Sequence, residues 1–371
     1  MARRSNKEML RAAQAGIEAF ATWVQLVEQL PGVREGVQHM LSPDNDGRLP
    51  RHLGRYPYFT PGHPRFADTM AEVRDCAIFH LWGQSKVVYA MDDDMLGYLS
   101  ESSASSIPTE ILRNLPHANP YILLPAPDLD DPDTAYYRTH IGVPWGAFVF
   151  GRYRNAQLLC PTNDERREDL GLMFLGFLED EGTPDLQTVR CTVPLREQTL
   201  TVESVVSATV AGFTFNEHLA EDDRSKFEVW LRKYVALVFN SLVYVCTDQP
   251  DIATYRPGFN RAGKLKKSAR GQQQRPRPSD IREVVQLGFR LGPALFEARQ
   301  RWEREQGQRP TGTGARQPPH RRRGTYRTYW TGRGRQVPKL KWVKPYWVSQ
   351  DLLGDEAPQT AVVRRVKKRP H

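Results

Sequence analysis

The residues best suited to bind a ligand are arginines, lysines and aromatic residues that alternate near the end of the chain, between residues 321 and 347. Guanidinium groups bind phosphates in a bidentate manner, and flat aromatic rings offer surfaces on which unpaired bases stack. This composition predicts a nucleic-acid-binding surface. We assign phosphate contacts to Arg321, Arg322, Arg323, Arg327, Arg333, Arg335 and Lys341, and base stacking to Tyr329 and Trp342.

The same segment, residues 324–348, has the pattern of two β-strands around a turn that contains glycine. The alternation of a strand places Tyr326 and Trp330 on one face and Arg327 and Tyr329 on the other. In a second interpretation, the rings fill a small core and the cations only keep the surface soluble. Because side chains alternate between the two faces, we expect each interpretation to hold for part of the segment.

Charge is divided unequally along the 371 residues. Residues 1–250 hold 23 Lys and Arg against 34 Asp and Glu, a net charge of −11, whereas residues 251–371 hold 29 against 9, a net charge of +20. The two parts are therefore expected to face different partners, and the basic part to face a polyanion. A content of 39% hydrophobic residues excludes a fully disordered chain.

Each candidate motif for a metal or a cofactor lacks residues that its function requires. Residues 258–265 match the first seven positions of a phosphate-binding loop, but Leu265 replaces the hydroxyl that would hold magnesium. The aspartates between residues 128 and 133 lack the glycine and glutamate that an EF-hand loop requires, and they are expected to form a solvated acidic loop. The nine histidines never have the spacing of a metal-binding helix. We predict no catalytic residue, metal, cofactor or small-molecule substrate.

The elements that must position these residues form an α+β fold. Apolar spacing predicts helices over residues 7–29, 66–81, 93–99 and 108–115. A strand is expected over residues 86–91, and further apolar stretches occur at 121–124, 145–150, 170–178 and 189–193. Helices and strands do not alternate as they would around a parallel sheet, which favours α+β. A helix over residues 223–247 is apolar on nearly every side after Val235, as expected for one buried centrally in a core.

Composition changes sharply after this helix and suggests four parts. They are an acidic α+β body (residues 1–254), a basic flexible linker (255–279), a basic module (280–349) and a basic tail (350–371). Asp280 and Glu283 have the spacing of a capping box, which predicts that the basic module begins with a helix continuing to Trp302. The β-hairpin completes this module.

Three observations bear on the cellular location. The cysteines at positions 76, 160, 191 and 246 lie among apolar neighbours and form no CxxC pair, which predicts buried free thiols in a reducing compartment. The first residues are expected to form an amphipathic helix, and we predict no signal peptide. No apolar run is long enough to span a bilayer, so we expect a cytoplasmic protein without membrane contact.

Three segments resemble a family of proteins carried on phages, plasmids and other mobile elements. They are VFNSLVYVCTDQPDI (residues 238–252), VVQLGFRLGPALFEAR (284–299) and PPHRRRGTYRTYWTGRGRQVPKLKWVKPYWVS (318–349). The named member of the family is the type V-A anti-CRISPR protein that lowers expression of the CRISPR effector nuclease. The family places histidine where this chain has Thr325 and Arg327, while His320, Trp330 and Gly332 of its pattern remain, together with Arg322 and Arg323.

The resemblance implies an accessory protein that recognises a polypeptide emerging during translation and causes loss of its messenger RNA. On this hypothesis the acidic body recognises the target polypeptide, and the basic module approaches RNA or the ribosome. The extra arginine at position 327 favours simple phosphate binding.

Two alternatives of other classes stay open. The first is a metal-dependent nuclease that uses scattered acids such as Asp92, Asp93 or Asp128. Cleavage of labelled RNA in magnesium, abolished by EDTA, would favour it. The second is a phage or plasmid structural protein whose cationic tail packs against its own acidic body. Salt-insensitive cohesion of the two parts, with no RNA retained on purification, would favour that one.

Overall fold

The structure of the protein is a computed structural model of residues 1–371. The structure describes residues 6–42, 50–100, 102, 107, 109–124, 143–151, 169–180, 183–195, 204, 207, 221–257, 279–295, 297, 300, 320–322, 324–335, 337–344 and 346–348. The acidic loop at 128–133, the segment 258–265 and the basic tail 350–371 lie outside these residues, as does Cys160.

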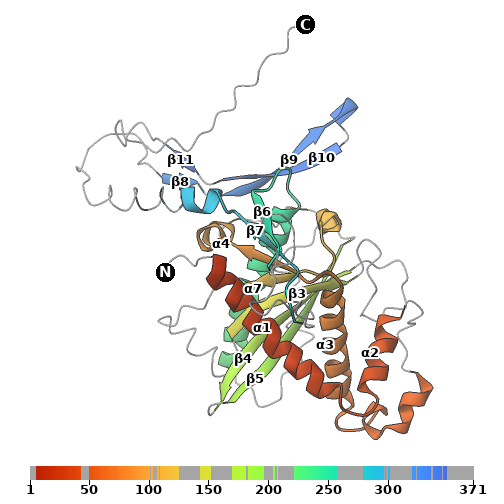
Figure 1. The fold of residues 1–371 in the computed structure, drawn as a ribbon. Helices are drawn as coiled ribbons and strands as arrows, with labels where there is room; N and C mark the ends of the chain where they lie inside the picture. The colour runs from red at the N-terminus through yellow and green to blue at the C-terminus, as the bar shows by residue number, and fades with distance from the viewer. Residues whose placement is uncertain are drawn as a thin grey trace, which may run out of the picture.

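A seven-stranded mixed sheet forms the centre of the fold (Figure 1). Its strands, in spatial order, are β5 (Thr183–Pro194), β4 (Asp169–Asp180), β3 (Val143–Gly151), β2 (Tyr121–Leu123), β1 (Val87–Met91), β7 (Glu283–Leu287) and β6 (Ile252–Tyr255). β1 pairs in parallel with both β2 and β7, whereas the other neighbours are antiparallel. Helices together with this mixed sheet confirm the predicted α+β class.

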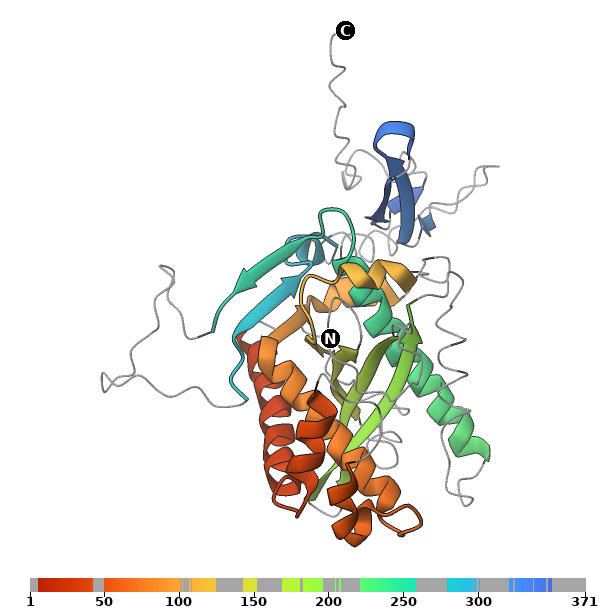
Figure 2. The same cartoon turned by 90° about the vertical axis from the view of Figure 1, so that its right-hand side faces the viewer.

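Three N-terminal helices cover one face of the sheet, as Figure 2 shows for α1 and α3. They are α1 (Asn6–Val27), α2 (Val33–Leu41) and α3 (Phe66–Ser85), and the short 3₁₀ helices η1 (Arg51–Arg55) and η2 (Pro57–Phe59) connect α2 to α3. The predicted helices 7–29 and 66–81 are thereby confirmed. The apolar stripe of α1, which includes Ile17 and Phe20, packs with Phe148 of β3 in one core because burial of this stripe removes apolar surface from water.

The opposite face carries α4 (Asp93–Ser100), the 3₁₀ helix η3 (Thr109–Asn114) and the long helix α7 (Glu221–Val245). As predicted, the second half of α7 is buried on nearly every side. Leu242 and Val243 are fully buried in the second core, which explains why no polar stripe interrupts the sequence there. Within the described residues, no helix is long and apolar enough to cross a membrane.

The predicted helix from Asp280 to Trp302 is wrong in its first half. Glu283–Leu287 is strand β7, which lies between β1 and β6, and helical residues begin only at Leu291. Val284, Leu287 and Leu291 have helical spacing, but a strand buried on both faces also appears as a continuous apolar run. β7 therefore joins the sheet of the body, although it follows the predicted linker. The four-part division of the chain stays a prediction.

The cysteines that the structure describes are free thiols, as predicted. Cys76 and Cys191 are buried and Cys246 is half-buried. Burial raises the pKa of the Cys191 thiol to about 12. This thiol stays protonated near neutral pH and acts as a small apolar group in the core.

His117 connects two strands of the sheet and should make stability depend on pH. Its Nδ1 lies 3.0 Å from the hydroxyl of Tyr89, and its Nε2 lies 3.5 Å from a carboxylate oxygen of Glu283. Burial lowers the pKa of His117, so the unfolded chain binds a proton at higher pH than the folded chain. Stability from this group is complete above the unfolded pKa, about 6.5, and is lost as the pH falls from that value through the lower pKa of the folded state.

We therefore expect wild type to lose more stability between pH 7.5 and pH 5 than the His117→Gln variant. Urea denaturation at both pH values measures the difference. An equal loss in both proteins would show that His117 does not contribute to acid sensitivity.

Candidate nucleic-acid interface

The predicted hairpin is confirmed as β9 (Thr325–Thr331) and β10 (Val337–Val343), joined by the 3₁₀ turn η4 (Arg333–Arg335). It stands at one end of the sheet and projects away from the body (Figures 1 and 2). A second, short pair is formed by β8 (His320–Arg322) and β11 (Tyr346–Val348). The hairpin therefore presents most of its length beyond the main core.

One face of the hairpin is anchored to α7 by buried side chains. Tyr326, Leu340 and Trp342 belong to the same core as α7. The Tyr326 hydroxyl donates a 2.7 Å hydrogen bond to the backbone oxygen of Asn240, and the backbone nitrogen of Asp248 donates one of 2.7 Å to the oxygen of Leu340. These bonds satisfy polar groups that would otherwise be buried unpaired.

Trp342 is the main anchor and is 8% exposed. Its ring packs edge-on against Tyr244, with ring centroids 5.7 Å apart, and its Nε1 donates to the hydroxyl of Ser102 at 3.3 Å. A Cβ at Gly324 would lie 2.9 Å from this ring, so a larger residue there would displace it. The assignment of Trp342 to base stacking stays a prediction; in this structure most of its apolar ring fills the gap between the hairpin and α7, and the rest lines the cavity described below.

The other face of the hairpin, which we call the open face, carries the cations. Register places Arg327 opposite Lys341 and Tyr329 opposite Lys339, and all four are exposed. Like charges directly opposite each other destabilise an antiparallel pair. A bound anion would relieve this repulsion, so the open face has the electrostatic character of a phosphate-binding surface.

Most of these cations form no ion pair with the residues that the structure describes. Lys339 Nζ lies 3.6 Å from Asp248 Oδ1, with both side chains about half exposed. In the part of the chain that the structure describes, no ion pair is formed by Arg327, Arg333, Lys341 or Lys344. Among the described residues, the alternative in which the cationic tail packs against the acidic body is therefore supported by the ion pair of Lys339 and by none of the other four cations.

Trp330 is an exposed ring that the sequence-based assignment of stacking residues missed. It is 58% exposed and lies opposite Pro338, near the turn of the hairpin. Alternation correctly placed it on the same face as Tyr326, but the hairpin extends past the body, so only the base of that face is covered. No local sequence signal reveals where the body ends beneath the hairpin.

The structure describes the side chain of only one of the remaining arginines that were predicted to contact phosphates. Arg321 and Arg322 lie in β8, and Arg335 lies in η4, but only their backbones are described. Arg323 lies outside the described residues, whereas Arg333 is exposed in η4. The assignment of phosphates to these arginines stays a prediction.

The acids named for the nuclease alternative do not converge where the structure describes them. Asp92 is buried, and its Oδ1 accepts a 3.4 Å hydrogen bond from the backbone nitrogen of Met95 at the start of α4. It thus has the capping role that a carboxylate commonly takes at a helix N-terminus. Asp128 lies outside the described residues. Among the residues described, no group of three or more His, Cys, Asp or Glu could hold a metal ion.

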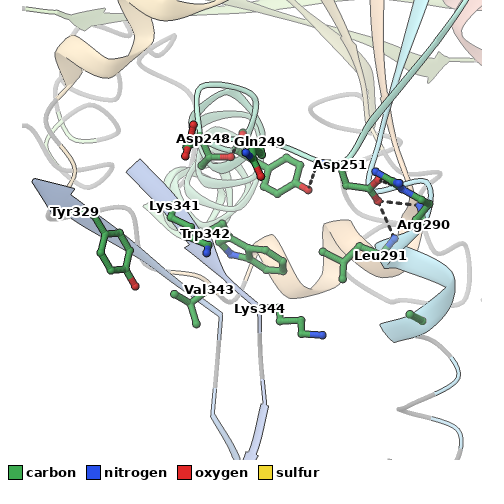
Figure 3. Close-up of a pocket in the computed structure, with 13 residues that line it drawn as sticks. Asp248, Gln249, Asp251, Arg290, Leu291, Tyr329, Lys341, Trp342, Val343 and Lys344 are labelled. Atoms are coloured by element: carbon green, nitrogen blue, oxygen red, sulfur yellow. Dashed lines mark hydrogen bonds and ion pairs between the residues drawn. The ribbon is translucent and has the colours of Figure 1, made fainter. Parts of the chain in front are cut away.

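A cavity of about 640 Å³ adjoins the hairpin where β10 meets the end of α7 and the helix that begins at Leu291 (Figure 3). Trp342 and Leu291 contribute apolar surface, and Lys341 and Lys344 contribute positive charge. Tyr329 and Lys341 belong both to this cavity and to the open face.

Together these features define a mixed α+β protein that presents a cationic β-hairpin at one end of its sheet. Comparison with known protein families then identifies the family. Residues 89–350 match the AcrVA2-like family, described as the anti-CRISPR type V subtype A2 family, and the chain belongs to it. This match confirms the resemblance noted in the sequence.

The chain is similar to solved structures, among them that of an anti-CRISPR protein. The crystal structure of AcrVA2 aligns with 17% sequence identity and a TM-score of 0.49, covering 90% of this chain and 98% of that one. A search of curated proteins gave no match.

Proposed function

We propose that this chain is an anti-CRISPR-like regulator from a mobile element that lowers expression of a target by binding RNA and the target polypeptide. RNA, free or in the ribosome, binds the open face of the hairpin, and the acidic body binds the polypeptide. Both events take place in the cytoplasm. Membership of the AcrVA2-like family supports the regulatory role, and the charge division supports the two separate partners.

The observation that carries the RNA part of this proposal is the pairing on the open face. Arg327 lies opposite Lys341, and neither has a carboxylate partner among the described residues. A protein that needed these cations only for solubility would gain nothing from placing them in direct opposition. Their arrangement favours a ligand whose own negative charges repeat.

Single-stranded RNA fits this surface better than a duplex does. Rings that stack on bases require bases that are unpaired, and Tyr329 is exposed on the same face as the cations, opposite Lys339. Lys339 and Lys341 point to the same side of β10, about 6.7 Å apart along the strand. Such a row of cations can follow the backbone of an extended strand.

Salt dependence tests the RNA contact. Replacing Arg327 or Lys341 with alanine removes one phosphate contact and should lower the salt slope of RNA binding by about 0.7, which is about a fivefold loss of affinity at 0.1 M salt. Fluorescence anisotropy with an unstructured oligoribonucleotide measures both quantities. Arg34→Ala and Arg51→Ala remove exposed arginines far from the hairpin in sequence and serve as matched controls. Equal slopes in all four variants would remove the open face from the interface.

A further inference from the structure

The cavity beside β10 has walls of three different kinds (Figure 3). Trp342, Leu291 and Ala294 supply apolar surface on β10 and on the helix that begins at Leu291. Lys344 follows the end of β10, and the exposed Gln249 follows the end of α7. Its volume, about 640 Å³, lies within the range of pockets that hold small ligands.

The acids of the cavity are already paired. Asp251 accepts hydrogen bonds of 2.8 Å from the backbone nitrogens of Arg290 and Leu291 and one of 2.9 Å from Arg290 Nε, as the dashed lines in Figure 3 mark for this cluster. Asp248 lies near Lys339. Lys341 and Lys344 form no ion pair among the described residues. The charge left for a ligand is therefore positive, and the ligand should be an anion.

The cavity is also continuous with the open face. Tyr329 and Lys341, which lie on opposite strands of that face, both line the cavity. A strand of RNA held by Arg327 and Lys341 would therefore pass its mouth. A nucleotide joins an anion, a flat apolar ring and a hydrogen-bonding edge, and the cavity offers cations, apolar side chains and the amide of Gln249.

We propose that this cavity receives one nucleotide of a single-stranded RNA bound along the open face. Its base leaves the stack and lies against Trp342 and the Leu291 helix, while Lys341 and Lys344 contact the neighbouring phosphates. This inference rests on the proposed RNA-binding function and adds to it a defined subsite. An acidic peptide shares the negative charge but lacks the flat ring and the continuity with a repeating phosphate backbone.

An abasic scan tests the subsite. A series of otherwise identical oligoribonucleotides, each lacking the base at one position, keeps every phosphate and removes one ring at a time. In wild type, removal of the base that lies in the cavity should lower the affinity about tenfold, more than removal of a neighbouring base does. Fluorescence anisotropy at constant salt measures each affinity.

Ala294→Phe provides the matched variant, because Ala294 is exposed on a helix and lines the cavity. The phenylalanine should occupy the base position, so the variant binds the intact oligonucleotide less tightly and loses the dependence on that base. Ala294→Ser leaves the cavity open and should behave as wild type. Lys344→Ala should weaken binding equally for intact and abasic strands, and Lys344→Arg should restore it.

Failure of the subsite differs from failure of the RNA function. If RNA binds and Arg327→Ala weakens it, but no abasic position stands out in wild type, the subsite is wrong and the RNA function stands. If wild type binds no RNA, both are wrong. If a polyglutamate peptide binds wild type and Ala294→Phe abolishes that binding while the abasic profile is flat, the cavity is an acidic-peptide site and the nucleotide assignment is overturned.

Discussion

The Trp342→Ala variant is expected to lose about 3–5 kcal/mol of the stability that holds the hairpin to the body, since truncating a buried tryptophan leaves a cavity. The indole is 8% exposed, packs against Tyr244 and donates to Ser102, so its loss removes apolar contact and leaves a hydroxyl acceptor unused. Urea denaturation followed by circular dichroism measures the change. Faster cleavage by trypsin at Lys339 and Lys341 would report release of the hairpin.

Trp330→Ala is the matched control, because it makes the same chemical change on the same hairpin at a ring that is 58% exposed. Stability should change by less than about 0.5 kcal/mol, as for surface substitutions in general. Affinity for single-stranded RNA should stay close to that of wild type, because Trp330 lies on the face opposite Arg327 and Lys341. Equal losses of stability in the two variants would contradict the assignment of Trp342 as the anchor.

Asp75→Ala is expected to be the other strongly destabilising change, at about 3 kcal/mol, because it breaks a buried ion pair. Asp75 lies on α3, is 4% exposed, and has Arg190 Nη1 of the edge strand β5 at 3.1 Å from its Oδ1. Thr188 donates a 2.9 Å hydrogen bond to its Oδ2. Burial raises the pKa of Asp75, while Arg190 and Thr188 lower it, so the carboxylate depends on both partners.

A double variant separates the ion pair from the packing around it. Asp75→Leu with Arg190→Met replaces both charges with apolar groups and should recover most of the stability, because neither charge is left buried alone. Asp68→Ala, on the exposed first turn of α3, should cost less than about 1 kcal/mol. Urea midpoints measure all three proteins. A double variant as unstable as Asp75→Ala would show that the carboxylate supports the fold other than by pairing with Arg190.

Alternate residues of the hairpin strands have different roles, because their side chains point to opposite faces. Tyr326 and Trp342 face α7 and hold the hairpin in place, while Arg327 and Lys341 face solvent. The proposed RNA contact thus depends on the anchor, because cations on a detached ribbon would lose their fixed spacing. Variants of the anchor should therefore weaken RNA binding along with stability, whereas variants of the open face should change RNA binding alone.

Amphipathic periodicity in the sequence was sufficient to predict the elements that bury one face. The stripe of α1 and the apolar second half of α7 predicted both helices to within two residues at each end. Alternation also predicted the hairpin and the separation of Arg327 from Tyr326, because side chains of a strand alternate whatever lies beneath them. The family resemblance likewise depended on sequence alone and is confirmed over residues 89–350.

Where an apolar pattern is compatible with two conformations, or with a buried or an exposed position, the tertiary structure determined which one occurs. β7 was mistaken for a helix because pairing with β1 and β6, which are distant in sequence, determined its conformation. Trp342 and Trp330 are the same residue type on one face of one hairpin, yet only the first meets the body. Sequence thus determined which side chains share a face. Exposure of each depended on where α7 ends beneath the hairpin, because burial results from contacts between segments that local periodicity does not encode.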